Sequence, residues 1–147
     1  MISQKAKYAL RALVALAKAG QGEALVIGAI ATDEKIPKKF LEQILLDLKR
    51  NGILESRRGK DGGYLLLKPA DEVTFGEVLR LVDGPLAPLP CLSKVAYRRC
   101  VDCKNERSCE IRKVFAGVAI ASRKVLDGTT LQDAITGNFS SEENILE

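Results

Sequence analysis

Apolar residues recur at helical spacing through the first third of the chain. Ser3 is a suitable N-cap, and the residues between it and Gly20 place an apolar face on a first helix: Ala6, Ala9, Leu10, Leu13, Val14 and Ala17. A shorter pattern predicts a second helix from about residue 27 to 35. Pro37 then starts a third helix, expected over residues 37–50, which carries one apolar stripe: Phe40, Leu41, Ile44, Leu45 and Leu48.

Two short strands joined by a glycine-rich turn are expected next. The strands cover residues 53–58 and 64–67, and the turn between them contains Gly59, Gly62 and Gly63, which tolerate positive φ. Three helices followed by a hairpin is the order of a winged helix-turn-helix. The pattern therefore predicts a mainly α fold with a small β-hairpin.

A second long apolar stripe begins near Ser108. Before it, Thr74 and Glu77 form a capping-box pattern that opens a short helix ending near Val82. The later stripe covers one face of a long helix expected to end before Gly128: Ile111, Val114, Phe115, Val118, Ser122, Val125 and Leu126. In a small domain such a stripe needs a partner, which is either a second subunit or the protein's own chain.

Charge is unevenly distributed along the 147 residues. The formal net charge is +4, but residues 1–69 contain 13 Lys and Arg against 7 Asp and Glu, whereas residues 70–147 contain 10 against 12. A basic half on a small domain favours a polyanionic partner such as nucleic acid, although a solvated surface alone gives the same bias.

Two groups of polar residues are candidates for contacting DNA. On the third helix, Lys38 and Lys39 stand at the N-terminal end, where phosphate is favoured. Glu42 and Gln43 lie opposite the apolar stripe, and these residue types pair with cytosine and adenine, although they are also ordinary surface residues. The tip of the hairpin adds a second group, suited to phosphate or to a narrow minor groove: Arg57, Arg58, Gly59 and Lys60.

All four cysteines lie within nineteen residues: Cys91, Cys100, Cys103 and Cys109. A proline-rich segment, residues 84–90, precedes them and prevents helix formation. Thiolates that converge in a loop suit a soft metal ion or an iron–sulfur cluster, whereas a four-cysteine zinc site and a metal-free disulfide switch are the alternatives. The basic residues between the cysteines are expected to lower the thiol pKa values: Lys94, Arg98, Arg99, Lys104 and Arg107.

Other classes of protein are disfavoured. The chain has no histidine, and its Cys100-x-x-Cys103 pair lies in a basic loop rather than between a strand and a helix, so an enzyme is not expected. No apolar run approaches the ~20 residues of a membrane span, and no signal-peptide pattern opens the chain. We therefore expect a cytoplasmic protein, in whose compartment clustered cysteines more often bind metal or sense redox state.

Four segments carry a family signature: Lys7-Tyr8-Ala9-Leu10-Arg11-Ala12-Leu13, Phe40-Leu41-Glu42-Gln43-Ile44, Lys49-Arg50-Asn51-Gly52-Ile53-Leu54, and Arg58-Gly59-Lys60-Asp61-Gly62-Gly63-Tyr64-Leu65-Leu66. Together they closely resemble the IscR-type bacterial transcription regulators, whose members include IscR, NsrR, RirA and CymR. The resemblance covers residues 1 to about 136. It implies a dimeric winged-helix protein that binds a palindromic operator, with a cluster in several members held before the dimerisation helix.

The resemblance also implies which residues bind DNA. Glu42 and Gln43 match the recognition-helix pair, and Arg58 with Gly59 matches the wing.

The cysteines match the family only in part. Cys91, Cys103 and Cys109 match its three cysteines, although the gap after Cys91 is longer. The fourth ligands of two members do not carry over, because Arg112 stands where IscR has a histidine, and Lys7 stands where NsrR has an aspartate. Cys100 is therefore the expected substitute.

Taken together, these patterns divide the chain into four parts. They are a winged helix-turn-helix DNA-binding domain (1–84), a cysteine-bearing cofactor loop (85–109), a dimerisation helix with a short terminal helix (110–136) and a polar, acidic tail (137–147). We expect a homodimeric regulator of transcription, most simply a repressor. Its affinity for double-stranded DNA is expected to depend on an iron–sulfur cluster or on the redox state of the loop, with zinc as the alternative metal.

Overall fold

The structure is a computed structural model that describes residues 2–60 and 62–138. Three helices open the chain: α1 (Gln4–Ala19), α2 (Ile27–Glu34) and α3 (Lys38–Arg50). A hairpin of β1 (Leu54–Arg57) and β2 (Gly63–Leu66) follows, with Leu54 paired to Leu66 and Arg57 to Gly63. The predicted order of three helices and a hairpin is therefore confirmed.

The helices form because their apolar faces pack together. Ser3 caps α1 by accepting a hydrogen bond from the amide of Ala6 at 3.0 Å. The expected stripe of α3 is buried at Leu41, Ile44, Leu45 and Leu48, and it packs on fully buried residues of α1: Ala9, Ala12, Leu13 and Leu16. Burying each such leucine contributes about 1.5–3 kcal/mol, so this contact holds α3 in place.

The hairpin is held close to its turn by a segment before α2, a contact that the sequence did not reveal. Leu25 and Tyr64 exchange two backbone hydrogen bonds of 2.9 Å, which form an antiparallel bridge beside β2. Gly63 is needed here because its φ is 139° and a Cβ would lie 2.2 Å from the Leu25 carbonyl oxygen. A Cβ on Gly62 would lie 2.3 Å from the Arg57 carbonyl oxygen. Because they lack side chains, Gly62 and Gly63 let the backbone approach Arg57 and Leu25 closely.

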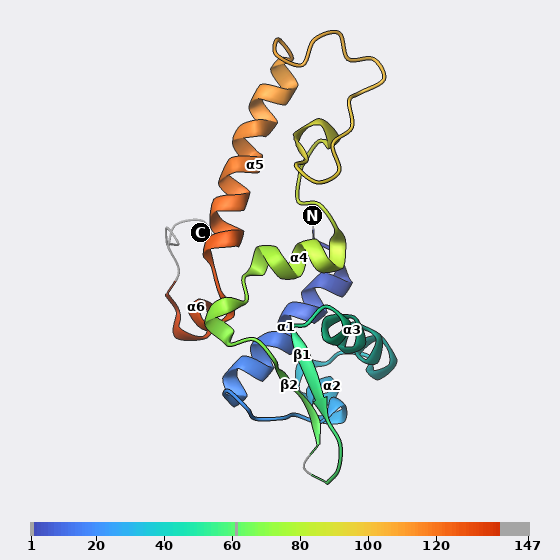
Figure 1. Cartoon of the computed structure of the whole chain (residues 1–147), viewed down its shortest axis with the longest axis vertical. Helices are drawn as coiled ribbons and strands as arrows, with labels where there is room; N and C mark the ends of the chain where they lie inside the picture. Colours follow the sequence, from blue (N-terminus) through green and yellow to red (C-terminus); the bar gives the residue numbers. More distant parts are fainter. Residues whose placement is uncertain (1, 61, 139–147) are drawn as a thin grey trace.

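The second half of the chain builds an arm away from this domain. After η1 (Ala70–Glu72) come α4 (Phe75–Asp83), η2 (Pro90–Leu92), α5 (Glu110–Gly128) and α6 (Leu131–Thr136). Figure 1 shows α5 rising from the domain, with the loop of residues 93–109 at its far end and the hairpin pointing the opposite way. Nineteen residues at about 1.5 Å each make α5 about 28 Å long.

The short helix α6 returns to the first domain. The amide of Leu131 donates to the Val73 carbonyl at 2.9 Å, and Leu131 is fully buried in the core. The amide of Phe75 likewise donates to Thr129 at 3.0 Å. Although the sequence groups α6 with the long helix, these contacts pack it on α1 and η1. The tail beyond residue 138 lies outside the described residues.

Several boundaries differ by one or two residues from the prediction. Pro37 is the N-cap of α3 rather than part of its first turn, because its ψ of 125° is not helical. The long helix begins at Glu110 rather than Ser108, since the side chain of Cys109 caps it. Thr74 caps α4 as expected, but the Glu77 carboxylate pairs with Lys68 at 2.8 Å instead of returning to close a capping box.

Candidate nucleic-acid interface and cysteine loop

The outward face of α3 is polar and exposed. Lys38 and Lys39 form its first turn, where no acidic residue competes, and Glu42 and Gln43 follow on the same solvent-facing side. The free amides of a helix N-terminus favour an anion, and two lysines beside them add positive charge. This face therefore exposes residue types that can bind phosphate and hydrogen-bond to base edges.

One of these side chains is held in a network. The amide nitrogen of Gln43 donates to Asp47 Oδ1 at 3.1 Å, and Lys5 Nζ lies 3.0 Å from Asp47 Oδ2. The hydrogen bond from Lys5 is the main cause of a lowered Asp47 pKa, and the bond from Gln43 also lowers it. Lys5 and Asp47 are 42 positions apart, so the sequence pattern did not reveal that they orient Gln43.

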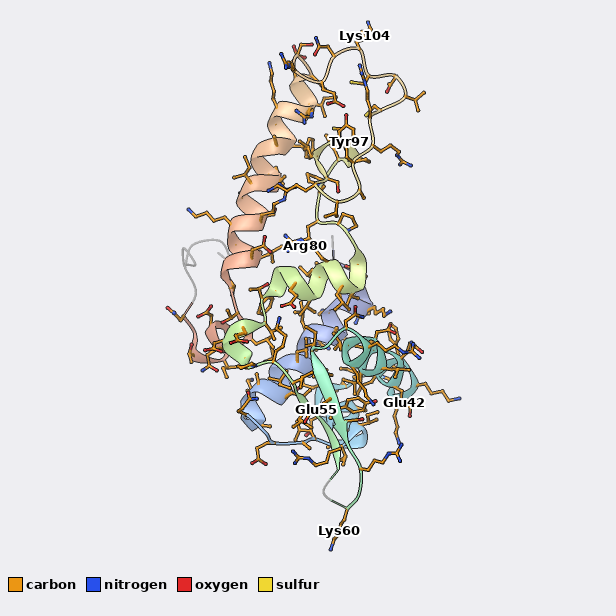
Figure 2. All side chains as sticks on the ribbon, viewed as in Figure 1. Glu42, Glu55, Lys60, Arg80, Tyr97 and Lys104 are labelled. Atoms are coloured by element: carbon orange, nitrogen blue, oxygen red, sulfur yellow. The ribbon has the colours of Figure 1, made fainter. Side chains whose placement is uncertain are left out.

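The wing presents its basic residues at one extremity of the molecule. Arg57, Arg58 and Lys60 are exposed, and Figure 2 shows Lys60 projecting from the tip of the hairpin. Lys49 Nζ donates to Ser56 Oγ at 2.7 Å and links α3 to β1. The predicted residues of α3 and of the wing thus lie on one half of the molecule, opposite the loop that carries Lys104.

The four cysteines occupy different environments. Cys91 is buried in η2, Cys103 and Cys109 are half-buried, and Cys100 is exposed; all four are free thiols. The amide of Cys103 donates to the carbonyl of Cys100 at 3.2 Å in a tight turn. Within residues 2–60 and 62–138, no three Cys, Asp or Glu side chains are arranged to hold a metal ion.

The thiols nevertheless influence one another. Loss of hydration raises the pKa of the exposed Cys100 thiol, and negative charge on Cys91, Asp102, Cys103 and Cys109 raises it further. The expectation that basic residues lower the thiol pKa is therefore wrong for Cys100. Thiolate sulfur is nevertheless the donor type that an iron–sulfur cluster or zinc requires, although the four cysteines do not converge on one point among the described residues.

Two arginines of α5 tie the cysteine loop to the helix. Arg112 donates from Nη2 to the Cys91 carbonyl at 3.4 Å, and its amide donates to Cys109 Sγ at 3.4 Å. Its Nε is buried and has no hydrogen-bond partner among the described residues. Arg123 Nη2 donates to the Leu92 carbonyl at 2.9 Å. Sequence spacing gave no signal for either contact, since both span more than 20 positions.

The apolar stripe of α5 stays exposed within the single chain. The exposed fractions are 63% for Ile111, 66% for Val114, 46% for Val118 and 60% for Val125, whereas Ala119 on the inner face is 2% exposed. Intramolecular packing therefore does not satisfy this stripe in the described part of the chain.

An ion pair connects the base of α5 to α4. Arg80 holds Asp127 through two hydrogen bonds, and Gly76 leaves room for it, because a Cβ there would lie 2.0 Å from Asp127 Oδ1. The arm is thus fixed to the domain that carries α3 and the wing.

Comparison with known proteins supplies an independent view. Residues 2–137 match the profile of the Rrf2 family, described as iron-dependent transcriptional regulators. An rrf2-like protein of Rhodobacter capsulatus, named as an HTH-type transcriptional regulator, is 50% identical over 138 residues and 92% of each chain. The structure of CymR, the global cysteine regulator of B. subtilis, superposes with a TM-score of 0.77 at 30% identity, covering 93% of this chain and 97% of that one.

IscR from T. potens shares the fold as well, with a TM-score of 0.70 at 24% identity over 100% of this chain and 93% of that one. Both structural neighbours support the predicted mainly α winged-helix fold with its small hairpin. Among the described residues, no helix is both long and apolar enough to cross a membrane.

Proposed function

Because this chain belongs to the Rrf2 family of transcriptional regulators, a non-enzymatic class of DNA-binding proteins, we propose that it binds a palindromic operator as a homodimer. We further propose that it acts as a repressor under the control of its cysteine loop. The observation that carries the proposal is the arrangement of the candidate DNA-contacting residues and the cysteines along the length of the molecule. The exposed face of α3 and the wing lie at one end, the cysteines at the other, and an uncovered apolar helix joins them.

The exposed residues support specific roles on DNA. In our proposal α3 enters the major groove, where Glu42 and Gln43 contact base edges and the amides at its start, with Lys38 and Lys39, bind phosphate. The wing then reaches the flanking backbone or the minor groove through a second set: Arg57, Arg58, Gly59 and Lys60. The core packing of α3 and its link to β1 keep both elements in a fixed relation.

The stripe on α5 supports pairing with a second copy. Five large side chains on one face are 39–66% exposed: Ile111, Val114, Phe115, Val118 and Val125. Burying them in a two-fold interface would contribute about half of the 1.5–3 kcal/mol of full burial for each side chain, because each is already partly covered. A two-fold axis along this helix would present two copies of α3 to the two halves of a palindrome.

For the cofactor, we propose that Cys91, Cys103 and Cys109, with Cys100 as the fourth thiol, hold an iron–sulfur cluster. When bound, such a cluster supplies a redox-active group whose loss or oxidation changes the charge and shape of the loop. Arg112 would transmit that change, because it contacts both Cys91 and Cys109 from the first turns of α5. We also propose the division into a DNA-binding domain (1–84), a cofactor loop (85–109) and a segment (110–136) whose long helix pairs with a second copy and whose short terminal helix packs on the first domain.

The test is DNA selection with two preparations of the full chain, one purified without oxygen and one treated with a chelator. Genomic fragments are incubated at low salt and recovered with the protein. Enrichment of a common inverted repeat, with affinity that differs between the preparations, is the expected result. If neither preparation retains any fragment, the DNA-binding proposal fails. If both bind equally, control by the loop fails while DNA binding stands. One zinc per chain, with no iron or sulfide, would replace the cluster by a structural zinc site.

A further inference from the structure

A small cavity lies where α4, the loop after η2 and α5 meet. Its volume is about 280 Å³, at the small end of the range for ligand sites. One part of its lining is aliphatic, from Pro85, Leu86 and Val95. Another part carries Arg80, whose position between α4 and α5 is visible in Figure 2. A cavity of this size suits a small metabolite rather than a nucleotide or peptide.

The charged lining has an excess of cations. Asp127 lines the cavity but is already neutralised by Arg80, with hydrogen bonds of 2.6 and 2.8 Å. Lys94 and Arg123 also line it and also lower the Asp127 pKa, after the larger effect of Arg80. Within the described residues neither forms a salt bridge. Arg123 uses one of its five N–H donors on the Leu92 carbonyl, which leaves the others available.

A nearly buried hydroxyl completes the polar side. Ser93 lines the cavity and is only 8% exposed. Its Oγ accepts a hydrogen bond from the Ala96 amide at 2.9 Å, so its own O–H remains to donate, and no acceptor for it lies among the described residues. A hydroxyl donor beside two cations without carboxylate partners is the kind of group set that binds an oxyanion.

We propose that this cavity binds a small organic acid. Its carboxylate would contact Ser93, Lys94 and Arg123, and its short aliphatic body would pack on the apolar wall. Because the lining comes from α4, the loop and α5, the acid would join the DNA-binding domain, the cysteine loop and the arm at one point. The site would therefore give the regulator a second input, separate from the cysteines. This proposal goes beyond the proposed function and requires neither DNA nor a cofactor.

The test measures binding of acetate, butyrate and isovalerate to the purified full chain by calorimetry and by NMR. Butyramide, which has the same body without the charge, and inorganic phosphate, which has charge without the body, are the comparison ligands. Saturable binding on the order of millimolar is expected for butyrate or isovalerate, as suits ligands of so few atoms. Lys94→Gln and Ser93→Ala should each weaken it about tenfold. Lys124→Gln, an exposed lysine on α5 outside the cavity lining, should leave it unchanged.

Several results would overturn the proposal. They are saturable binding of none of the three acids, binding of butyramide or phosphate as tight as that of butyrate, and equal weakening by Lys124→Gln and Lys94→Gln. Circular dichroism of each variant confirms folding, and Lys94→Gln serves as the deciding variant because Lys94 is exposed and bears no packing role.

Discussion

The guanidinium of Arg80 on α4 donates two hydrogen bonds to the carboxylate of Asp127 on α5, with Nη1–Oδ1 at 2.6 Å and Nη2–Oδ2 at 2.8 Å. The two residues are 47 positions apart, and their pairing links α5 to α4 near the end of α5 that meets the first domain. Parallel hydrogen bonds of this kind constrain orientation as well as distance. The pair therefore contributes to the orientation of α5 relative to α4.

This pair should make stability depend on pH. The hydrogen bond from Arg80 lowers the pKa of Asp127 in the folded chain below its ordinary value of 3.8, with burial acting in the opposite direction. Such a carboxylate stabilises the fold at pH values above 3.8, and its contribution is lost as the pH falls through the lowered pKa. Asp127→Asn should cost about 0.5 kcal/mol at pH 7, because the pair is exposed to solvent. In acid its cost should disappear. Urea unfolding at both pH values measures this, and an equal difference at both would contradict it.

Space for the pair depends on Gly76. A Cβ there would lie 2.0 Å from Asp127 Oδ1, so Gly76→Ala should displace this exposed carboxylate and lower the free energy of unfolding by about 0.5 kcal/mol, the contribution of the pair. Gly28→Ala in α2 is the control, since no atom lies within 4 Å of its Cβ and its φ is ordinary. That control should gain about 0.4–1 kcal/mol. Thermal unfolding of the two variants compares them directly, and a Gly76→Ala protein as stable as the control would show that α4 and α5 adjust freely.

The wing is expected to contribute to DNA affinity through Arg58. Arg58→Ala should weaken operator binding by about 1–3 kcal/mol if the side chain reads a base, with discrimination lost at one position. If it meets phosphate, the loss should be uniform across sequences and the salt dependence should decrease by about one charge. Gel-shift titrations at several salt concentrations distinguish these cases. Lys124→Ala, on α5 and remote from the wing, is the control, and equal loss in both variants would rule out a specific role for Arg58.

Pairing through α5 is expected to depend on the face that carries Val118. Val118→Glu would place a charge in an apolar interface and should convert the dimer to a monomer at micromolar concentration. Ile120→Glu is a matched control, because Ile120 is 67% exposed and lies about 160° around the helix from Val118. Light scattering reports both masses. A monomeric wild-type protein would contradict dimerisation. A dimer that survives Val118→Glu but not Ile120→Glu would place the interface on another face of α5.

The cysteine loop is expected to bind iron and sulfide through Cys109 and its neighbours. Protein purified without oxygen should be brown, and Cys109→Ala should bleach it, because removing a thiolate opens the coordination of the cluster. Cys109 also caps α5, accepting from the Arg112 amide, so Cys109→Ser is a useful companion that keeps a side-chain acceptor there. Visible absorption with iron and sulfide analysis measures the effect. Colourless wild-type protein that contains zinc and resists anaerobic reconstitution would eliminate the cluster.

Local features of the sequence predicted most of the fold. The stripe of Leu41, Ile44 and Leu45 predicted α3, and Gly59 and Gly63 predicted the turn of the wing, because periodicity and positive φ are properties of short segments. Contacts between distant segments left no such pattern. The bridge from Leu25 to Tyr64 is the clearest case, since nothing in either residue indicates its partner.

In the candidate site, too, local features could be predicted from the sequence and contacts between distant segments could not. Exposure of Glu42, Gln43 and Arg58 follows from their places relative to the apolar stripe and the turn. The anchoring of the cysteine loop by Arg112 and Arg123 does not, because an arginine on an amphipathic helix ordinarily faces solvent. Cysteine spacing likewise gave the set of thiols but not their unequal burial, which depends on how η2 packs against α5.

The bridge between Leu25 and Tyr64 closes a long loop of the chain. Helices α2 and α3, strand β1 and the turn of the wing all lie between these two residues, so the bridge joins the two ends of the segment that contains them. The conformational entropy of closing this loop is lost on folding, and breaking the bridge would free the end of β2 next to the turn from the segment before α2. The wing is therefore not expected to move independently of α3. We therefore expect any displacement of the first domain relative to α5 to move α3 and the wing together.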